Sequence, residues 1–321
     1  MKAVVTGATG LVGQYLVREL LQTGKFSEIL ALGRNEQTLN HLQDLGSRIM
    51  QFDLLLNDFN ELKDWTGDSI WFHCAAAISG ADKETLESVN IKGTQLLIDF
   101  LTNNPISKII HVSSIAIYGL HEEGMFKEDL EKYPSSNYAK TKHIQEQLIT
   151  NSKLNWIVFR PPFIGGPNDK NFLFEFANRI TNKKMPSFTK SGSISYIDVR
   201  DLCRGMVQSA IIDDSHEIYN IKGFNFIFDE FVKLFAKLLK IEPPYGKKYN
   251  YSLVMGLAVF LEIYYKLTGN SNERKLSRYR IRTLTSQRTL DDSKFREKYM
   301  FTPNISPEKS IQDWIQVANN E

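Results

Sequence analysis

The sequence predicts an α/β fold in which a doubly wound parallel sheet is followed by a smaller, mainly helical lobe. Short β-branched and apolar runs alternate with amphipathic stretches through the first half of the chain, which is typical of strands and helices in turn. A glycine-rich turn joins the first apolar run to the first amphipathic stretch. Parallel strands that alternate with helices are covered on both faces, so a doubly wound sheet is expected.

Six runs are expected to form the strands of this sheet, because their interiors are apolar and β-branched. They are residues 2–7, 28–34, 48–54, 69–76, 108–114 and 155–161. The first helix is expected over residues 11–25, because apolar side chains recur there at helical spacing and Gly24 offers a stop.

Three glycines follow the first strand in "VVTGATGLVG". Glycine permits a tight turn and lets a ligand approach the backbone, and the helix that follows offers unpaired N–H groups and a positive dipole. Strand, turn and helix in this order predict a site for the pyrophosphate of a dinucleotide. The positions expected to bind it are Gly7, Thr9, Gly10, Leu11, Val12 and Gly13.

Arg34 stands at the end of the second strand in "ALGRN". In such folds an acidic residue at this point binds the ribose 2′-hydroxyl of NAD, whereas an arginine accommodates the 2′-phosphate of NADP. The sequence places no carboxylate at this strand end, the nearest being Glu36 in the following segment. NADP is therefore the expected cofactor, with NAD as the alternative because Arg34 can also stack on adenine.

Regularity weakens after residue 160, where "RPPFIGGPNDKN" at 160–171 predicts a long loop. Residues 1–160 are accordingly assigned to a dinucleotide-binding domain and residues 161–321 to a substrate lobe. The segments expected in this lobe are helices at 172–182 and 228–240, a strand at 193–199 that leads into a helix up to 211, and a strand at 217–223. Some of these segments are expected to rejoin the main sheet.

Tyr138 and Lys142 lie four residues apart in "SSNYAKTKH". On a helix this spacing puts the phenol and the ammonium on one face. A tyrosine with an ordinary pKa of about 10 is a poor acid or base at neutral pH, and a fixed cation beside it would favour the phenolate. The same spacing arises by chance in many chains, so other residues must decide whether the pair is catalytic.

Several further motifs accompany the glycine turn and the tyrosine–lysine pair. They are "FDL" at 52–54, "HCAAA" at 73–77, "VNIKGT" at 89–94, "HVSS" at 111–114, "FRPPFIGGP" at 159–167 and "YIDVRD" at 196–201. With them the chain resembles the extended short-chain dehydrogenase/reductase family, which has a Rossmann fold and includes NAD-dependent epimerases and dehydratases. The resemblance covers most of the chain.

The resemblance implies a role for each matching position. Tyr138 becomes the catalytic acid/base, and Lys142 lowers its pKa and holds the nicotinamide ribose. Ser114 is expected to hydrogen-bond the substrate oxygen, in preference to its neighbour Ser113. The other positions expected to contact the cofactor are Asp53 and Leu54 at adenine, Ala75 and Ala76 behind the fourth strand, and Pro161 beside the nicotinamide amide.

The expected reaction is hydride transfer between NAD(P) and a ketone or secondary alcohol of a fairly apolar small molecule. Family members that act on nucleotide sugars usually carry an arginine that grips the diphosphate, and Ile194 and Ser195 occupy the matching Arg-Asp positions here. The carboxyl-terminal region resembles the 3β-hydroxysteroid dehydrogenase and dihydroflavonol reductase branch. A nucleotide-sugar epimerase or dehydratase is the alternative enzyme, and a non-catalytic cofactor-binding sensor or scaffold is the alternative of another class.

Composition narrows the choice of partner and compartment. A net charge of +2 without blocks of like charge gives no indication of nucleic-acid binding. Cys74 and Cys203 lie far apart without metal spacing, so they are expected to be core residues of a reduced, cytoplasmic protein that holds no metal. The start "MKAVVTG" shows no export leader. A homodimer is allowed by the resemblance.

Three features outside these motifs also receive an interpretation. His73 and His111 are expected to be core histidines, whereas Asn90 is equally compatible with the active site and with holding backbone structure. Residues 251–265 are almost entirely apolar, but Glu262 and Lys266 interrupt the stretch, and it is shorter than the roughly 20 residues that span a bilayer. A buried or lid helix is expected there, with a shallow membrane contact as the less favoured alternative.

Overall fold

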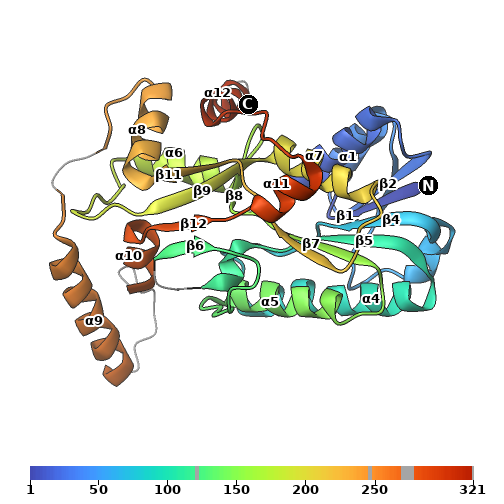
Figure 1. Ribbon diagram of the computed structural model, residues 1–321, viewed down its shortest axis with the longest axis horizontal. Coiled ribbons are helices and arrows are strands. Elements are labelled where there is room, and N and C mark those ends of the chain that lie inside the picture. Colours follow the sequence, from blue (N-terminus) through green and yellow to red (C-terminus); the bar gives the residue numbers. More distant parts are fainter. Residues whose placement is uncertain (120–122, 245–247, 269–277, 320–321) are drawn as a thin grey trace.

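A seven-stranded parallel sheet forms the centre of the computed structural model, which describes residues 1–119, 123–244, 248–268 and 278–319 (Figure 1). The strand order is β10-β7-β5-β4-β1-β2-β3, and every pairing is parallel. The strands are β1 (Lys2–Thr6), β2 (Glu28–Gly33), β3 (Arg48–Gln51), β4 (Gly67–His73), β5 (Ile106–Val112), β7 (Trp156–Arg160) and β10 (Glu217–Asn220). All six runs expected from the sequence are strands of this sheet.

Helices cover both faces of the sheet, so the doubly wound prediction is confirmed (Figure 1). Along β1, Val5 points to one apolar core and Val4 to the other, as the period of two requires. One face carries α1 (Leu11–Thr23), α2 (Glu36–Asp44), α7 (Val199–Ala210) and α11 (Ser293–Tyr299). The opposite face carries η1 (Phe59–Trp65), α4 (Thr94–Asn103) and α5 (Asn137–Thr150). As expected, α1 ends at Gly24, whose φ of 61° is left-handed.

The segments after residue 160 build a second, aromatic core. It lies between α6 (Phe172–Thr181), α8 (Phe228–Leu238), α12 (Pro307–Ala318) and β9 (Ser193–Asp198). Strand β9 pairs with β8 (Phe163–Gly165) and β11 (Phe224–Ile227), and β6 (Gly124–Phe126) pairs with β12 (Arg288–Leu290). The prediction of a continuous loop over 160–171 is wrong, because β8 forms by pairing with a strand distant in sequence.

Two segments beyond residue 160 return to the main sheet, as expected. Strand β10 extends the sheet beside β7, and α7 packs against α1. The division of the chain at residue 160 therefore stays a proposal. The remaining elements are α3 (Lys83–Glu87), η2 (Ser88–Gly93), η3 (Ile115–Tyr118), α9 (Tyr251–Thr268) and α10 (Arg278–Thr285).

Helix α9 departs from the expectation of a buried helix. Ala258 is buried, but Leu253, Phe260 and Leu267 are 74%, 64% and 81% exposed. Burial requires a facing surface, and in the described part of the chain one side of α9 meets none. Within the same part of the chain, no helix combines the length and the apolar character needed to cross a bilayer.

Candidate active site

The turn after β1 leaves the amino end of α1 open. Gly7 has a φ of 69°, and a Cβ there would lie 2.6 Å from the Ala75 nitrogen. A Cβ at Gly13 would lie 2.3 Å from the Gly7 oxygen, so this glycine lets α1 pack closely on the turn. Gly10 is the N-cap residue, no side chain caps the helix, and a Cβ there would first meet the Gly7 oxygen at 3.4 Å. These residues fit a dinucleotide, whose pyrophosphate the free N–H groups would hold.

On the adenosine side of this site, Asp53, which was expected at adenine, also pairs with Arg34, and the sequence analysis did not foresee this pairing. Arg34 Nη1 lies 3.5 Å from Asp53 Oδ2, and the arginine side chain is 71% exposed. The expectation that no carboxylate stands beside Arg34 is therefore wrong, because parallel pairing of β2 with β3 brings the two strand ends together. Leu54 is buried against Gly93, in line with a wall of the adenine site.

The carboxyl ends of β5 and β7 bring the expected catalytic groups together. Ser114 follows β5 and caps η3, accepting a hydrogen bond from the Ala116 N–H at 3.1 Å. Helix α5 begins after Ser136 and carries Tyr138 in its first turn. The Ser114 side chain lies beside the Tyr138 hydroxyl, close enough to act on its pKa. Pro161 lies next to them, since its carbonyl accepts the Ile115 N–H at 3.1 Å.

The acidity of Tyr138 is set differently from the expectation. Burial raises the pKa of Tyr138, and the neighbouring Ser114 side chain opposes this shift. Lys142 does not act on the Tyr138 pKa in this structure, so the expected lowering by the lysine is not observed. The lysine ammonium is directed elsewhere: Nζ donates to the Val112 carbonyl at 2.7 Å and to Gln145 Oε1 at 2.5 Å.

Lys142 is buried in a polar layer under the site. Burial lowers its pKa to about 7. Gln145 holds the ammonium on one side and donates to Thr94 Oγ1 at 2.8 Å on the other. His73 and His111 stack in the same layer with ring centroids 5.3 Å apart and are fully buried. Burial lowers the pKa of His73 to about 3, so it is a neutral core histidine, as expected.

A buried ion pair next to this layer was missed by the sequence analysis. Glu146 Oε1 lies 2.5 Å from Arg160 Nη2, and the two side chains are 5% and 1% exposed. Glu146 also accepts a hydrogen bond from Ser113 at 2.6 Å, and Arg160 donates to the Tyr118 hydroxyl at 2.9 Å. Ser113 is thus a structural residue, in agreement with the choice of Ser114. The sequence did contain a signal for Glu146. Tyr138, Lys142 and Glu146 recur every four residues, which places all three on one face of a helix.

Asn90 turns out to hold backbone structure. Its side chain accepts the Ala77 N–H at 2.7 Å, donates to the Ala77 carbonyl at 3.1 Å, and also donates to Thr141. These bonds fix the segment that follows β4, where Ala75 and Ala76 were expected to line the cofactor.

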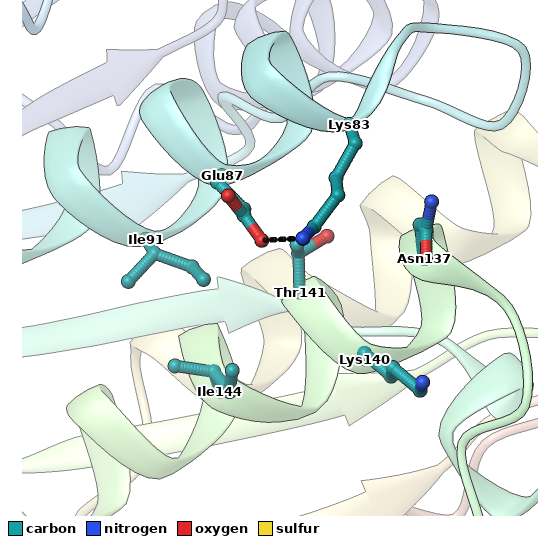
Figure 2. A pocket seen from close by; sticks show the side chains of 7 residues that line it. All are labelled: Lys83, Glu87, Ile91, Asn137, Lys140, Thr141 and Ile144. Carbon is teal, nitrogen blue, oxygen red and sulfur yellow. Dashed lines mark ion pairs between the residues drawn. The ribbon is translucent and has the colours of Figure 1, made fainter.

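A separate pocket lies on the outer side of α5 (Figure 2). Figure 2 shows the Lys83–Glu87 ion pair, 3.6 Å long, above Thr141 and Lys140. None of the expected catalytic side chains lines this pocket. Neighbouring residues along α5 therefore lie on two faces of the helix, and the face with Tyr138 and Lys142 points toward the sheet.

Comparison with protein families agrees with this geometry. The model of the NAD dependent epimerase/dehydratase family matches residues 3–221. The chain belongs to this family. The resemblance inferred from the motifs is thereby confirmed.

Two curated relatives and one solved structure illustrate the similarity. The 3β-hydroxysteroid-dehydrogenase/decarboxylase isoform 1 of Arabidopsis thaliana is 27% identical over 97% of this chain and 78% of the relative. The 4-hydroxy-2-methyl-3-oxo-4-farnesyl-3,4-dihydroquinoline-1-oxide ketoreductase of Stigmatella aurantiaca is 28% identical over 68% of this chain and 67% of the relative. The NAD complex of UDP-glucuronic acid 4-epimerase from Bacillus cereus superposes with a TM-score of 0.77 at 19% identity, covering 100% and 99% of the two chains. That last likeness concerns the fold alone.

Proposed function

We propose that the protein is an NAD(P)-dependent oxidoreductase that transfers a hydride between the nicotinamide and a ketone or secondary alcohol of a fairly apolar small molecule. The observation that carries this proposal is the placement of Tyr138 and Ser114 beside each other at the carboxyl end of β5, on the same sheet edge as the open turn after β1. Ligands bind at this edge in doubly wound folds.

The two hydroxyls suit a carbonyl substrate. When bound, the nicotinamide supplies or accepts the hydride at the carbonyl carbon. In the reducing direction Ser114 and Tyr138 both donate to the carbonyl oxygen, and Tyr138 gives up its proton as the oxygen becomes a hydroxyl. Lys142 follows one helical turn after Tyr138, and in this proposal its ammonium turns from the Val112 carbonyl toward the phenolate that remains and stabilises it. The intact set of three residues argues against a non-catalytic scaffold.

The interior of the substrate lobe favours an apolar substrate over a nucleotide sugar. Ile194 is 5% exposed and packs in the aromatic core. Ser195 bonds Asn225 at 2.6 Å and accepts the Leu290 N–H at 3.3 Å. The positions at which nucleotide-sugar members usually carry an arginine and an aspartate thus offer no cation. The names of the two curated relatives, with a steroid and a farnesyl group, are in keeping with an apolar substrate.

NADP is the cofactor that we propose, on the strength of Arg34. Its guanidinium is 71% exposed and pairs with Asp53 at 3.5 Å, a distance at which the contact is weak. A 2′-phosphate offers two oxygens to the planar guanidinium and would replace this contact.

The test combines a substrate panel with two variants. Purified protein is incubated with NADPH or NADH and with steroid ketones, long-chain ketones and nucleotide sugars, while nicotinamide absorbance is followed. Tyr138→Phe is expected to lower kcat by roughly 100-fold or more, as loss of general acid catalysis does, with little change in cofactor Kd. Tyr249→Phe, which removes a hydroxyl from an exposed tyrosine, is the control and should keep the parent rate.

Two results would overturn the proposal. A Tyr138→Phe variant with more than a few per cent of the parent rate would contradict the assigned role. Turnover or thermal stabilisation with nucleotide sugars, and none with apolar ketones, would indicate an epimerase or dehydratase instead.

A further inference from the structure

One side of α9 is a continuous exposed apolar surface, hereafter the α9 stripe. Its residues recur at steps of three and four, which places them along one face of a helix. They are Leu253, Leu257, Phe260, Ile263, Tyr264 and Leu267, and each is between 51% and 81% exposed. Figure 1 shows α9 extending beyond the rest of the fold. Soluble monomers rarely expose a contiguous apolar surface of this kind without a partner for it.

The opposite side of α9 attaches the helix to the protein. Ala258 is fully buried there, and Glu262 pairs with Arg278 of α10 at 2.6 Å. At its amino end the Tyr251 N–H donates to Thr189 Oγ1 at 3.2 Å. The ammonium of Lys190 lies 5.6 Å from the centre of the Tyr251 ring. These contacts fix which side of α9 faces outward, so the stripe is a property of the folded protein.

The α9 stripe carries no charge, whereas its surroundings are basic. The segment 183–190 pairs with the residues just before α9 through the Phe188–Tyr249 bridge, and Lys183 and Lys184 are exposed in it. Arg282 is exposed on α10. Among the described residues these three cations have no ion-pair partner.

Three of the acidic groups at this margin are each matched by a base. Asp229 lies 3.8 Å from Lys248, and Glu262 lies 2.6 Å from Arg278. Glu123 is paired with Lys190. Once these pairs are set aside, the described residues of this margin keep three unpaired cations, Lys183, Lys184 and Arg282, against one unpaired carboxylate, Glu242, so their balance is positive.

We propose that α9 binds the surface of a membrane that contains anionic lipids, lying in the plane of the bilayer with the stripe inserted between the headgroups. An uncharged face with leucine, phenylalanine and tyrosine, flanked by basic side chains, is the pattern of an interfacial helix. The positive margin complements lipid phosphates and carboxylates. Because no described helix can cross a bilayer, the contact is a shallow one.

The geometry favours lipid over a second copy of the chain. Spacing by three and four residues would also suit a coiled coil, but such pairs use charged residues beside the seam to select a partner. Ser252 and Gly256 stand in the stripe among its apolar residues, and neither can form such a pair. The inference does not rest on the proposed oxidoreductase function.

The experiment measures binding to vesicles by co-sedimentation. The full-length protein is mixed with vesicles of phosphatidylcholine alone or of phosphatidylcholine with about one-third phosphatidylserine, at low and at high salt. The parent is expected to bind the anionic vesicles and to lose most of this binding at high salt or without phosphatidylserine. Phe260→Glu and Leu257→Glu are each expected to weaken binding by roughly tenfold or more, since each removes one inserted apolar side chain.

Leu56→Glu is the matched control, because Leu56 is 85% exposed and lies in the loop after β3. This variant should bind vesicles like the parent. Circular dichroism and cofactor affinity establish that the α9 variants are folded.

Each remaining outcome overturns the inference. A parent that does not sediment with anionic vesicles, or α9 variants that sediment as well as the parent, would contradict it. A dimer in light scattering that Phe260→Glu dissociates, without vesicle binding by the parent, would show that a second copy covers the stripe. Loss of turnover of a water-soluble ketone in Phe260→Glu, again without vesicle binding, would show that α9 is a lid.

Discussion

Removing the Glu146 carboxylate tests whether the buried pair with Arg160 holds the floor of the active site. The pair is 2.5 Å long, both side chains are at most 5% exposed, and Glu146 also accepts a hydrogen bond from Ser113. Loss of one partner from a buried pair leaves an uncompensated charge and costs about 3–5 kcal/mol. Glu146→Ala should therefore lower the free energy of unfolding by that amount, and the melting temperature by roughly 6 °C or more.

The chain offers a matched control for this prediction. Glu175 pairs with Arg179 at 2.8 Å, again on a helix, but the two side chains are 59% and 54% exposed. Exposed pairs at this spacing contribute about 0.3–0.5 kcal/mol, so Glu175→Ala should be nearly neutral. The assay is urea unfolding followed by circular dichroism, with cofactor titration as a check on the folded state.

A double variant separates the lost charge from the lost volume. Glu146→Met combined with Arg160→Met removes both charges, and it should be more stable than Glu146→Ala by at least about 1 kcal/mol. If Glu146→Ala is as mild as Glu175→Ala, the pair does not stabilise the fold and the reasoning is refuted. If the double variant is no better than the single one, the loss arises from packing and not from charge.

Three further predictions follow from the same site. In Arg34→Ala, the ratio of kcat/KM for NADPH to kcat/KM for NADH should fall by roughly tenfold or more, since one charge-assisted phosphate contact is lost. An unchanged ratio, or a parent protein that prefers NADH, would show that Arg34 does not bind the phosphate. Because burial lowers the pKa of Lys142 to about 7, the unfolded chain binds more protons than the folded protein above that pH, and stability rises from pH 7 toward pH 10. For Lys142→Met this rise should be smaller by up to roughly 4 kcal/mol, and parallel stability curves for parent and variant would contradict the assignment. A Cβ at Gly13 would lie 2.3 Å from the Gly7 oxygen, whereas one at Gly10 would lie 3.4 Å from it. Gly13→Ala should therefore lower the free energy of unfolding by about 1–3 kcal/mol, whereas Gly10→Ala should leave the melting temperature unchanged but weaken cofactor binding. Thermal melts with and without cofactor distinguish the two effects.

The features that the sequence predicted correctly depend on neighbours along the chain. The strands of the main sheet follow from runs of apolar and β-branched residues, which favour extended backbone wherever they are placed. The open turn before α1 follows from glycine spacing, because only glycine adopts the φ of 69° at Gly7 without strain. The family motifs led to Ser114 and Tyr138, whose catalytic role stays a prediction, and the structure places the two side chains beside each other.

The features that the sequence analysis missed depend on segments brought together by folding. Asp53 reaches Arg34 only because β2 and β3 are adjacent in the sheet. Glu146 and Arg160 lie in different elements, and their spacing along the chain does not reveal that both are buried. Lys142 bonds a carbonyl of β5, which directs the ammonium away from the expected partner.

The sequence by itself therefore determined the class of fold and the glycine turn before α1, and it led to the proposal of Ser114 and Tyr138 as catalytic hydroxyls, because these rest on local conformational preference and on short motifs. Only the tertiary structure decided which charges are buried, what surrounds Arg34 and Lys142, and which side of α9 is uncovered. Burial and pairing depend on which chain segments the fold brings close together. The apolar sequence of residues 251–265 does not show whether another surface covers it in the folded protein.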